Sequence, residues 1–405
     1  MNQIIGKLIK DKPVHLWGAG ISGLVLAYYL KKAGFQVSLF EKSSQTGGKI
    51  GTKQTAWGPI ETAANALFLS PDALELIDEL KLTPKPSALK LKRHLYLNGK
   101  FCSPLSFKLM ARVILGWRKK IPPQEHPTVE DFLLPFFSRD LIDHLVSPSL
   151  GGIYATEARG LDMESLFPEE FKAKTYGEFL LNIKKRLQKN RGMRLKGSVS
   201  FEGGMQKLID ALTDSLKENI HLNYHEPFRL QDNTILCTDA LVASELLSGT
   251  DFSNPLKKIQ YAPLSTTTIY LRKKIKKLEN SFGVLIPRDQ GLHSIGILSN
   301  KDIFPFNYKD LSSYTFISPE IHDLEGKILS DLELLAPEIK QSDRVLVETK
   351  LWPAALPIYN KKRKLAVNEL HQIADKQAGV ILFGNYVAGI SLREMITAAK
   401  NFASQ

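Results

Sequence analysis

The chain has 405 residues, of which 43% are hydrophobic and 24% charged, and this composition excludes a disordered or fibrous protein. Its length favours two closely packed domains over one simple core. The 54 basic and 42 acidic residues give a formal charge of +12, which suits an anionic partner but equally fits a merely basic protein.

The cysteines and the N-terminal segment bear on the compartment. Cys102 and Cys237 lie far apart and in no CxxC pattern, so we expect neither a disulfide framework nor a zinc site, and a reducing compartment fits. The first eleven residues are too polar for a cleaved signal peptide. No run of 18 apolar residues occurs, so we expect a cytoplasmic protein without a membrane-spanning segment.

The first elements of the chain predict a dinucleotide-binding βαβ unit. A strand is expected over residues 14–17, a helix over 22–32 with apolar residues at helical spacing, and a second strand over 35–40. Between the first strand and the helix lies a GxGxxG pattern formed by Gly18, Gly20 and Gly23. Such glycines allow a tight turn, the approach of a pyrophosphate to backbone N–H groups, and close helix–strand contact. Glu41 ends the second strand, where an acid binds ribose hydroxyls.

A second glycine pair distinguishes flavin from nicotinamide. Gly47 and Gly48 follow Glu41 within a few residues. This arrangement resembles the flavoproteins of the amine oxidase and protoporphyrinogen oxidase superfamily, in which the pair lies against FAD, and NAD dehydrogenases do not usually carry it. The resemblance implies non-covalently bound FAD. Lys49 stands where many members have arginine, which keeps the charge and loses the planar fork.

Further along, the resemblance extends over nearly the whole chain and is closest to the protoporphyrinogen oxidases. Residues 58–65 resemble a family stretch beside the flavin, with Ala63 and Ala64 where Gly-Pro is usual. Residues 93–104 resemble a family hairpin whose arginine pairs with a substrate propionate, a role that the resemblance gives to Arg93. The alternative is an exposed strand arginine in a surface hairpin.

Several later segments also match the family. Residues 149–155 resemble a Gly-Ile-Tyr-Ala segment whose glycine carbonyl faces the tetrapyrrole, and residues 201–206 resemble a Gly-Gly-Met stretch beside the flavin. A family loop matches residues 353–359, but the tryptophan expected after it is replaced within 361–364. The implied substrate contacts are Arg93, Asn65, Gly152 and the apolar pocket walls Leu285, Leu298 and Phe316.

The C-terminal segment, residues 382–392, matches the family motif in which a helix N-terminus points at the flavin ring. A hairpin near residues 228–236 is shorter than in most members. The implied cofactor contacts are Gly18, Gly20, Ile21, Ser22, Gly23, Glu41, Lys42, Gly47, Gly48, Lys49, Phe228, Gly384, Asn385, Gly389, Ile390, Ser391 and Leu392.

The expected fold class is α/β, with a Rossmann-like FAD-binding domain interleaved with an α+β substrate domain that contains a mixed sheet. The predicted ranges are 1–70, 195–250 and 345–405 for the FAD domain, and 71–100 and 251–344 for the substrate domain. A helical, membrane-associating insertion is predicted over 101–194. Within it, residues 105–120 form a basic amphipathic pattern that suits an anionic membrane surface, although a core-facing helix with a solvated basic face would show the same pattern.

Two other site classes are rejected. His221 and His225 are four residues apart, but the alternation around them predicts a strand, along which four residues span about 13 Å, too far to share a metal ion. The basic residues lack the aromatic interleaving of nucleic-acid-binding proteins, so we expect no nucleic-acid partner.

The resemblance implies oxidation of protoporphyrinogen IX to protoporphyrin IX in haem biosynthesis, by three two-electron steps. In each step a methylene-bridge hydride passes to flavin N5, and dioxygen or another acceptor reoxidises the flavin. No side chain is assigned as acid or base, because the cofactor carries the chemistry. Alternatives are coproporphyrinogen oxidation, a flavin amine oxidase or desaturase, and a non-catalytic flavoprotein that binds tetrapyrrole. The enzyme is expected to be peripheral on the cytoplasmic side of a membrane; its oligomeric state is open, a homodimer included.

Overall fold

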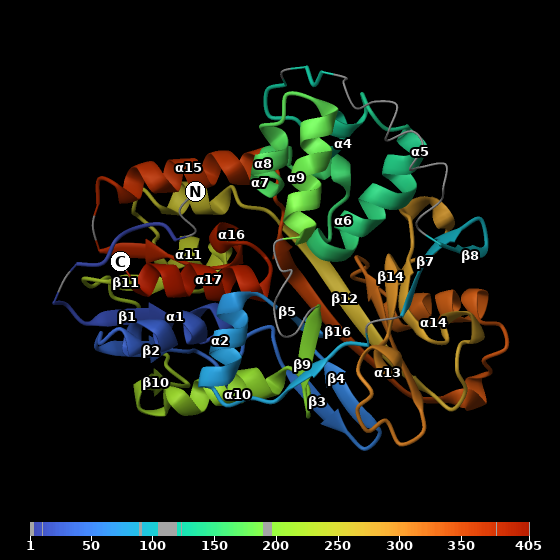
Figure 1. Ribbon diagram of the computed structural model, residues 1–405. Coiled ribbons are helices and arrows are strands. Elements are labelled where there is room, and N and C mark those ends of the chain that lie inside the picture. Colours follow the sequence, from blue (N-terminus) through green and yellow to red (C-terminus); the bar gives the residue numbers. More distant parts are fainter. Residues whose placement is uncertain are drawn as a thin grey trace. The chain divides into compact units, whose positions relative to one another are not determined.

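The computed structural model describes residues 4–9, 11–88, 91–103, 120–122, 124–188, 197–377 and 379–404. The chain divides into two compact units. The first comprises Met1–Ser87, Leu195–Gln260 and Leu365–Gln405, and the second comprises Ala88–Arg194 and Tyr261–Lys364. Each unit is therefore assembled from segments that are distant in the sequence, and each is described by itself below (Figure 1).

A five-stranded parallel sheet organises the first unit. In spatial order its strands are β10 (Ile220–His221), β2 (Val37–Phe40), β1 (Val14–Trp17), β11 (Thr234–Leu236) and β17 (Val380–Leu382). The predicted strand–helix–strand start is confirmed, with α1 at Ile21–Lys32 between β1 and β2. Alternate residues of β1 and β2 are buried and the others are partly buried, as expected for parallel strands that are covered on both faces.

Helices and two small sheets complete the first unit. Helix α1 packs against α17 and α10. The helices are α1, α2 (Pro71–Glu79), α10 (Gln206–Ser215), α11 (Ala240–Leu246), α12 (Ser253–Lys257), most of α15 (Lys361–Ala374), α16 (Asn385–Ala388) and α17 (Leu392–Ala403). The small sheets pair β3 (Thr52–Thr55) with β4 (Gly58–Glu61), and β5 (Leu67–Phe68) and β6 (Pro84–Pro86) with β9 (Ser198–Phe201).

The second unit is built on a seven-stranded mixed sheet, in which only β7 and β13 run parallel. Its strands in spatial order are β16 (Arg344–Pro357), β12 (Tyr261–Leu271), β15 (Ser312–Ser318), β14 (Gly296–Ser299), β13 (Ser281–Leu285), β7 (Lys92–Leu97) and β8 (Lys100–Cys102). Its hydrophobic core joins strand residues such as Val284, Ile297 and Phe316 to Ile328 and Leu332 of α14 (Leu324–Leu335). Figure 1 shows α14 beside the sheet, together with the short α13 (Asn300–Ile303).

Most helices of the second unit lie between residues 124 and 188. Thr128 begins this region with a capping box, in which its hydroxyl accepts from the Asp131 N–H and the Asp131 carboxylate accepts from the Thr128 N–H. The elements are α4 (Val129–Leu133), α5 (Arg139–Leu141), a π-helix (Ile142–Val146), α6 (Ser147–Tyr154), α7 (Met163–Leu166), α8 (Pro168–Phe171) and α9 (Tyr176–Gln188).

The two units differ from the predicted domain ranges in three places. Residues 251–260 belong to the first unit, where α12 packs against α11. Residues 71–87 belong to the first unit, because β6 pairs with β9. Residues 345–364 belong to the second unit, because β16 continues unbroken as the partner of β12. The predicted amphipathic helix over 105–120 falls outside the described residues, which resume at Lys120. Within the described ranges, no helix combines the length and apolarity needed to cross a membrane.

A buried tyrosine in the helical region allows a test of packing. The Tyr176 ring lies 5.0 Å from Phe136 and 5.6 Å from Phe137, and its buried hydroxyl has no hydrogen-bond partner among the described residues. Burial raises the pKa of this phenol to about 12. Because an unpaired buried hydroxyl costs free energy, we expect Tyr176→Phe to raise the free energy of unfolding by about 1 kcal/mol.

The matched control is Tyr314→Phe in the same unit, since the Tyr314 hydroxyl accepts a hydrogen bond from the Ile275 N–H at 3.0 Å. This variant should be destabilised because it leaves that N–H unpaired. Thermal denaturation of both variants beside the parent protein checks the difference. A clear loss of stability for Tyr176→Phe would contradict the expectation.

Candidate functional site

Two glycine segments make close backbone contact where β1 ends. A Cβ atom on Gly23 would lie 1.9 Å from the Gly18 carbonyl oxygen, and one on Gly48 would lie 3.1 Å from the Gly20 Cα. The Gly47 N–H donates to the Ala19 carbonyl at 2.8 Å and so holds the two segments together. No side chain caps α1 at its N-cap residue Gly20, which leaves its first N–H groups available to an anion. This bare backbone cradle fits a dinucleotide pyrophosphate.

Glu41 is held at the same turn. One carboxylate oxygen accepts from the Ala19 N–H at 2.7 Å, and the other accepts from the Ser43 N–H at 2.9 Å and the Ser43 hydroxyl at 2.8 Å. The carboxylate is thereby placed beside the glycine turn, where an acid receives ribose hydroxyls. Lys42 is exposed, whereas Lys49 is partly buried. Burial lowers the pKa of Lys49, although the negative charge of Asp239 acts to raise it.

Aromatic rings flank this edge of the sheet. The Phe228 ring meets Trp17 edge-on at 4.9 Å, and Trp17 lies 5.0 Å from Phe40, the last residue of β2. Tyr224 contacts both Trp17 and Phe40. Phe228 is therefore close to the glycine turn, as its predicted cofactor role requires, although that role stays a prediction.

The C-terminal motif lies in the same unit, because β17 is parallel to β11 and carries Gly384 and Asn385 at its carboxyl end. Gly389 has φ +101°, and a Cβ there would lie 2.4 Å from a carboxylate oxygen of Glu394. Ser391 caps α17 in a capping box with Glu394, so Ile390 and Leu392 flank a helix start. Ser22 of α1 donates its hydroxyl to the Met395 sulfur at 3.1 Å, so that side chain joins two helices and leaves its backbone N–H as the group available to the cofactor.

Glu61 is a partly buried carboxylate beside the Gly-Gly-Met stretch, and the sequence reasoning did not single it out. Its carboxylate accepts from the Met205 N–H at 2.9 Å and the Thr52 hydroxyl at 2.7 Å. Gly204 makes this possible, since its φ is +86° and a Cβ there would lie 2.5 Å from the carboxylate. Burial raises the pKa of Glu61 to about 7, against the lowering effect of the two hydrogen bonds. The sequence shows both the acid at the end of residues 58–61 and the Gly-Gly-Met stretch, but it does not show that the two are in contact.

Three of the predicted substrate contacts share one face of the seven-stranded sheet, here called the Arg93 face. Arg93 is paired with Gly283, which is paired with Leu298, and Leu285 is two residues from Gly283 on β13. Paired residues on neighbouring strands point to the same side, so Arg93, Leu285 and Leu298 do so as well. The Arg93 guanidinium lies 4.5 Å from the centre of the Phe282 ring. A Cβ on Gly152 of α6 would lie 3.4 Å from a Leu285 methyl carbon, so Gly152 meets the same face.

Phe316 and Asn65 lie elsewhere. Phe316 is paired with Ile297, so its side chain points to the opposite face, where it is 0% exposed in the core beneath α14. Strand alternation thus excludes it from the Arg93 face, and we leave it out of the proposed substrate surface. Asn65 belongs to the first unit, between β4 and β5.

The segment in which the expected tryptophan is missing carries buried cations instead. The Arg363 guanidinium lies 3.9 Å from the centre of the Tyr359 ring, and Tyr359 contacts Tyr154 of α6. The Lys364 ammonium forms an ion pair with Glu164. A substitution that looked like a loss of flavin packing therefore contributes a buried polar connection within the second unit.

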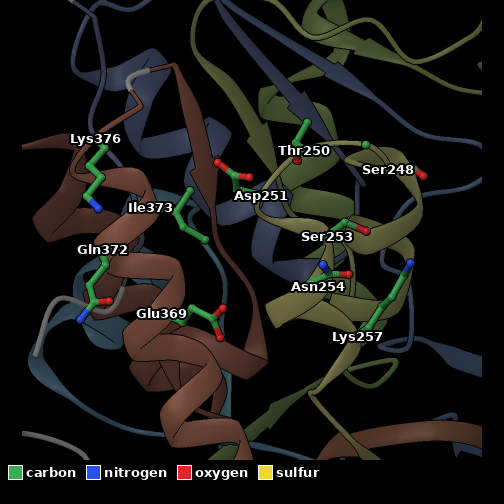
Figure 2. Close-up of a pocket in the computed structure, with 11 residues that line it drawn as sticks. Ser248, Thr250, Asp251, Ser253, Asn254, Lys257, Glu369, Gln372, Ile373 and Lys376 are labelled. Atoms are coloured by element: carbon green, nitrogen blue, oxygen red, sulfur yellow. The ribbon is translucent and has the colours of Figure 1, made fainter.

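A separate cavity of about 610 Å³ lies in the first unit, between the α11–α12 segment and α15 (Figure 2). Its walls are mostly polar, with Asp251 and Glu369 balanced by Lys257 and Lys376. None of the predicted cofactor residues lines it. The balanced charge and open polar walls distinguish this cavity from the glycine cradle.

Glu61 should make stability depend on pH. The pKa is raised from 4.5 to about 7 in the folded state, so the unfolded chain loses this proton first, and stability falls as pH rises between those values. Above about pH 7 the penalty is constant. We expect Glu61→Gln, which keeps an acceptor oxygen for the Met205 N–H, to melt progressively higher than the parent from pH 5 to pH 7.5. A melting-temperature difference that does not change with pH would count against the assignment.

Known proteins resemble this chain in sequence and in fold. The model of the NAD(P)-binding Rossmann-like domain matches residues 18–80. Protoporphyrinogen oxidase 2, chloroplastic/mitochondrial, of Arabidopsis thaliana is 26% identical, with 96% of this chain and 92% of that protein covered. The coproporphyrinogen III oxidase of Bacillus subtilis is 21% identical, with 96% of each covered. A solved structure from Exiguobacterium sp. 255-15, to which protoporphyrinogen oxidase activity is ascribed, superimposes with a TM-score of 0.78 at 18% identity and covers 98% of both chains.

These similarities agree with the predictions made from the motifs. The Rossmann-like match begins at the first glycine of the GxGxxG pattern. The similarity to the relatives extends over both units and implies FAD as the cofactor, as the second glycine pair predicted. The chain is a protoporphyrinogen oxidase-like oxidoreductase.

Proposed function

We propose that the chain is an FAD-dependent porphyrinogen oxidase that converts protoporphyrinogen IX to protoporphyrin IX in haem biosynthesis. The observation that carries this proposal is the near-complete coverage of plant protoporphyrinogen oxidases, together with a glycine cradle suited to FAD. When bound, FAD would supply the two-electron oxidation by hydride acceptance at N5, with dioxygen as the final acceptor. The residues of the chain then bind, orient and shield the reactants.

The first unit would hold the cofactor. Gly18, Gly20 and Gly23 allow the pyrophosphate to reach the first N–H groups of α1, and the carboxylate of Glu41 is in place for the ribose. Gly48 closes the cradle from the other side. The remaining proposed contacts are Ile21, Ser22, Lys42, Gly47, Lys49, Phe228, Gly384, Asn385, Gly389, Ile390, Ser391 and Leu392.

The Arg93 face would hold the substrate. A porphyrinogen is a broad apolar ring system with carboxylate side chains, and Leu285 and Leu298 provide an apolar surface beside a guanidinium. Within the described residues, no carboxylate forms an ion pair with Arg93, whose guanidinium stacks on Phe282 instead. A guanidinium held by an aromatic ring keeps its hydrogen-bond donors available for a propionate. Gly152 and Asn65 are the other proposed contacts.

A second candidate substrate is coproporphyrinogen. It is favoured by the full-length similarity to the Bacillus subtilis coproporphyrinogen III oxidase. The same hydride chemistry would serve both substrates, and the contacts to their carboxylates would distinguish them.

We further propose a cytoplasmic enzyme that binds an anionic membrane surface peripherally through the insertion at 101–194. A homodimer is compatible with this proposal.

Anaerobic mixing with substrate tests the proposed reaction directly. The purified protein should be yellow, and protoporphyrinogen should bleach its flavin absorbance because two electrons enter the cofactor. Coproporphyrinogen, mixed separately, gives the relative rates and thereby the preferred substrate. Bleaching by neither compound, or a colourless protein that does not take up FAD, would refute the proposal.

Arg93 can be tested by steady-state kinetics. A propionate anchor binds ground and transition states alike, so Arg93→Ala should raise KM about tenfold or more and lower kcat much less. The matched control is Lys92→Ala, which removes the same charge from the preceding position of β7, where the side chain points to the other face. Equal effects of the two substitutions on KM would reject a specific anchor.

A further inference from the structure

His144 connects two carboxylates from different parts of the second unit. Its Nδ1 lies 2.9 Å from the Asp140 carboxylate on α5, and its Nε2 lies 2.9 Å from the Asp289 carboxylate, which follows β13. Around His144 the helix widens into the π-helix Ile142–Val146. Such π-turns are rare and frequent at functional sites. The ring is thus bonded from both sides at an irregular point of the helix.

Two carboxylates on opposite sides of the ring favour its charged form. Imidazolium donates from both nitrogens, whereas neutral imidazole would turn a lone pair toward one of the two carboxylates. Burial by itself lowers the pKa of His144, but the hydrogen bonds and charges of Asp289 and Asp140 outweigh it and raise the pKa above 6.5. Because the folded pKa is raised, the stabilisation is present at lower pH and is lost as pH rises through that value.

The surrounding charges leave the two carboxylates as the groups that face the ring. Arg139, on the same helix as Asp140, forms an ion pair with Glu130 at 2.8 Å. Beside Asp289, burial lowers the pKa of the Arg288 guanidinium, and the charges of Glu157 and Glu320 oppose this lowering.

The hydrogen bonds continue from Asp289 to the hairpin that carries Arg93. Gln290 donates its side-chain amide to Asp289 at 2.7 Å, and its side-chain oxygen accepts from the Asn98 N–H at 2.7 Å. Asn98 lies at the turn between β7 and β8, five residues after Arg93. His144 therefore ends a chain of bonds that reaches the strand of the proposed propionate anchor.

His144 is connected to both of the elements, α6 and β13, that form the contact between Gly152 and Leu285. Helix α6, which carries Gly152, follows the π-helix directly, and Asp289 comes four residues after Leu285. We propose that His144 is a positioning residue, whose protonated ring holds α6 against the end of β13 and so shapes the Arg93 face for substrate. Its consequence for catalysis rests on the proposed porphyrinogen oxidation, whereas its consequence for the fold does not.

Two variants test the proposal. His144→Leu removes both bonds, so its α6 should be no better protected than that of the parent at high pH, and this protection should not change with pH. Asp289→Asn replaces an acceptor with an amide that can donate to the unprotonated Nε2, while Nδ1–H still bonds Asp140, so it should retain the connection at high pH. This second variant separates the titration of His144 from a general effect of pH on the enzyme.

The first measurement is hydrogen exchange of the amides in residues 147–154 between pH 6 and pH 9, corrected for intrinsic rates. Protection in the parent should fall about fivefold, the equivalent of one lost hydrogen bond, and stay nearly constant in Asp289→Asn. Identical pH dependence in these two proteins, or parent-like protection in His144→Leu, would overturn the proposal. This readout needs no substrate.

The second measurement is the pH dependence of KM for the porphyrinogen that is oxidised faster. KM of the parent should rise with pH in step with the loss of protection, and KM of Asp289→Asn should not. Protection that changes without any change in KM would overturn the positioning role and leave a structural connection alone. Absence of turnover in the parent at every pH would refute the proposed function, and the exchange measurement would still decide whether His144 holds α6.

Discussion

The contact between two backbone segments at the end of β1 is the constraint on which the candidate cofactor site depends. Gly23 lies so close to Gly18, and Gly48 to Gly20, that a single added carbon would collide with or crowd the backbone. The absence of side chains leaves the start of α1 open to an anion. Because the strands of this sheet are parallel, the other predicted cofactor segments follow their carboxyl ends or lie beside them.

In the second unit, strand alternation places the core residues and the proposed substrate contacts on opposite faces of the sheet. Val284, Ile297 and Phe316 point into the core beneath α14, while Arg93, Leu285 and Leu298 point to the opposite face. The core residues provide packing, and the residues of the Arg93 face lie on the side of the sheet that is proposed to meet the substrate. At the start of α15, where the tryptophan implied by the resemblance is missing, Arg363 stacks on Tyr359 and Lys364 pairs with Glu164.

Local patterns were sufficient for the elements around the glycine turn. The spacing of apolar residues predicted β1, α1 and β2 within a few residues, and the positions of the glycines and of Glu41 predicted their meeting place. Phe316 shows where such reasoning ends: the family resemblance implied that it lines the pocket wall, but the register with Ile297 decides which face of the sheet its side chain takes. A shift of one residue in register would reverse that outcome.

The sequence by itself determined the dinucleotide turn, the choice of FAD and the resemblance to protoporphyrinogen oxidases, because each depends on residues close together in the chain. Only the tertiary structure decided that Glu61 meets the N–H of Met205, 144 residues later, and that His144 meets Asp289, 145 residues later. Neither pair leaves a local pattern, since a carboxylate or an imidazole is compatible with many surroundings. Burial and hydrogen bonding give these groups their properties, and both arise only when distant segments pack together.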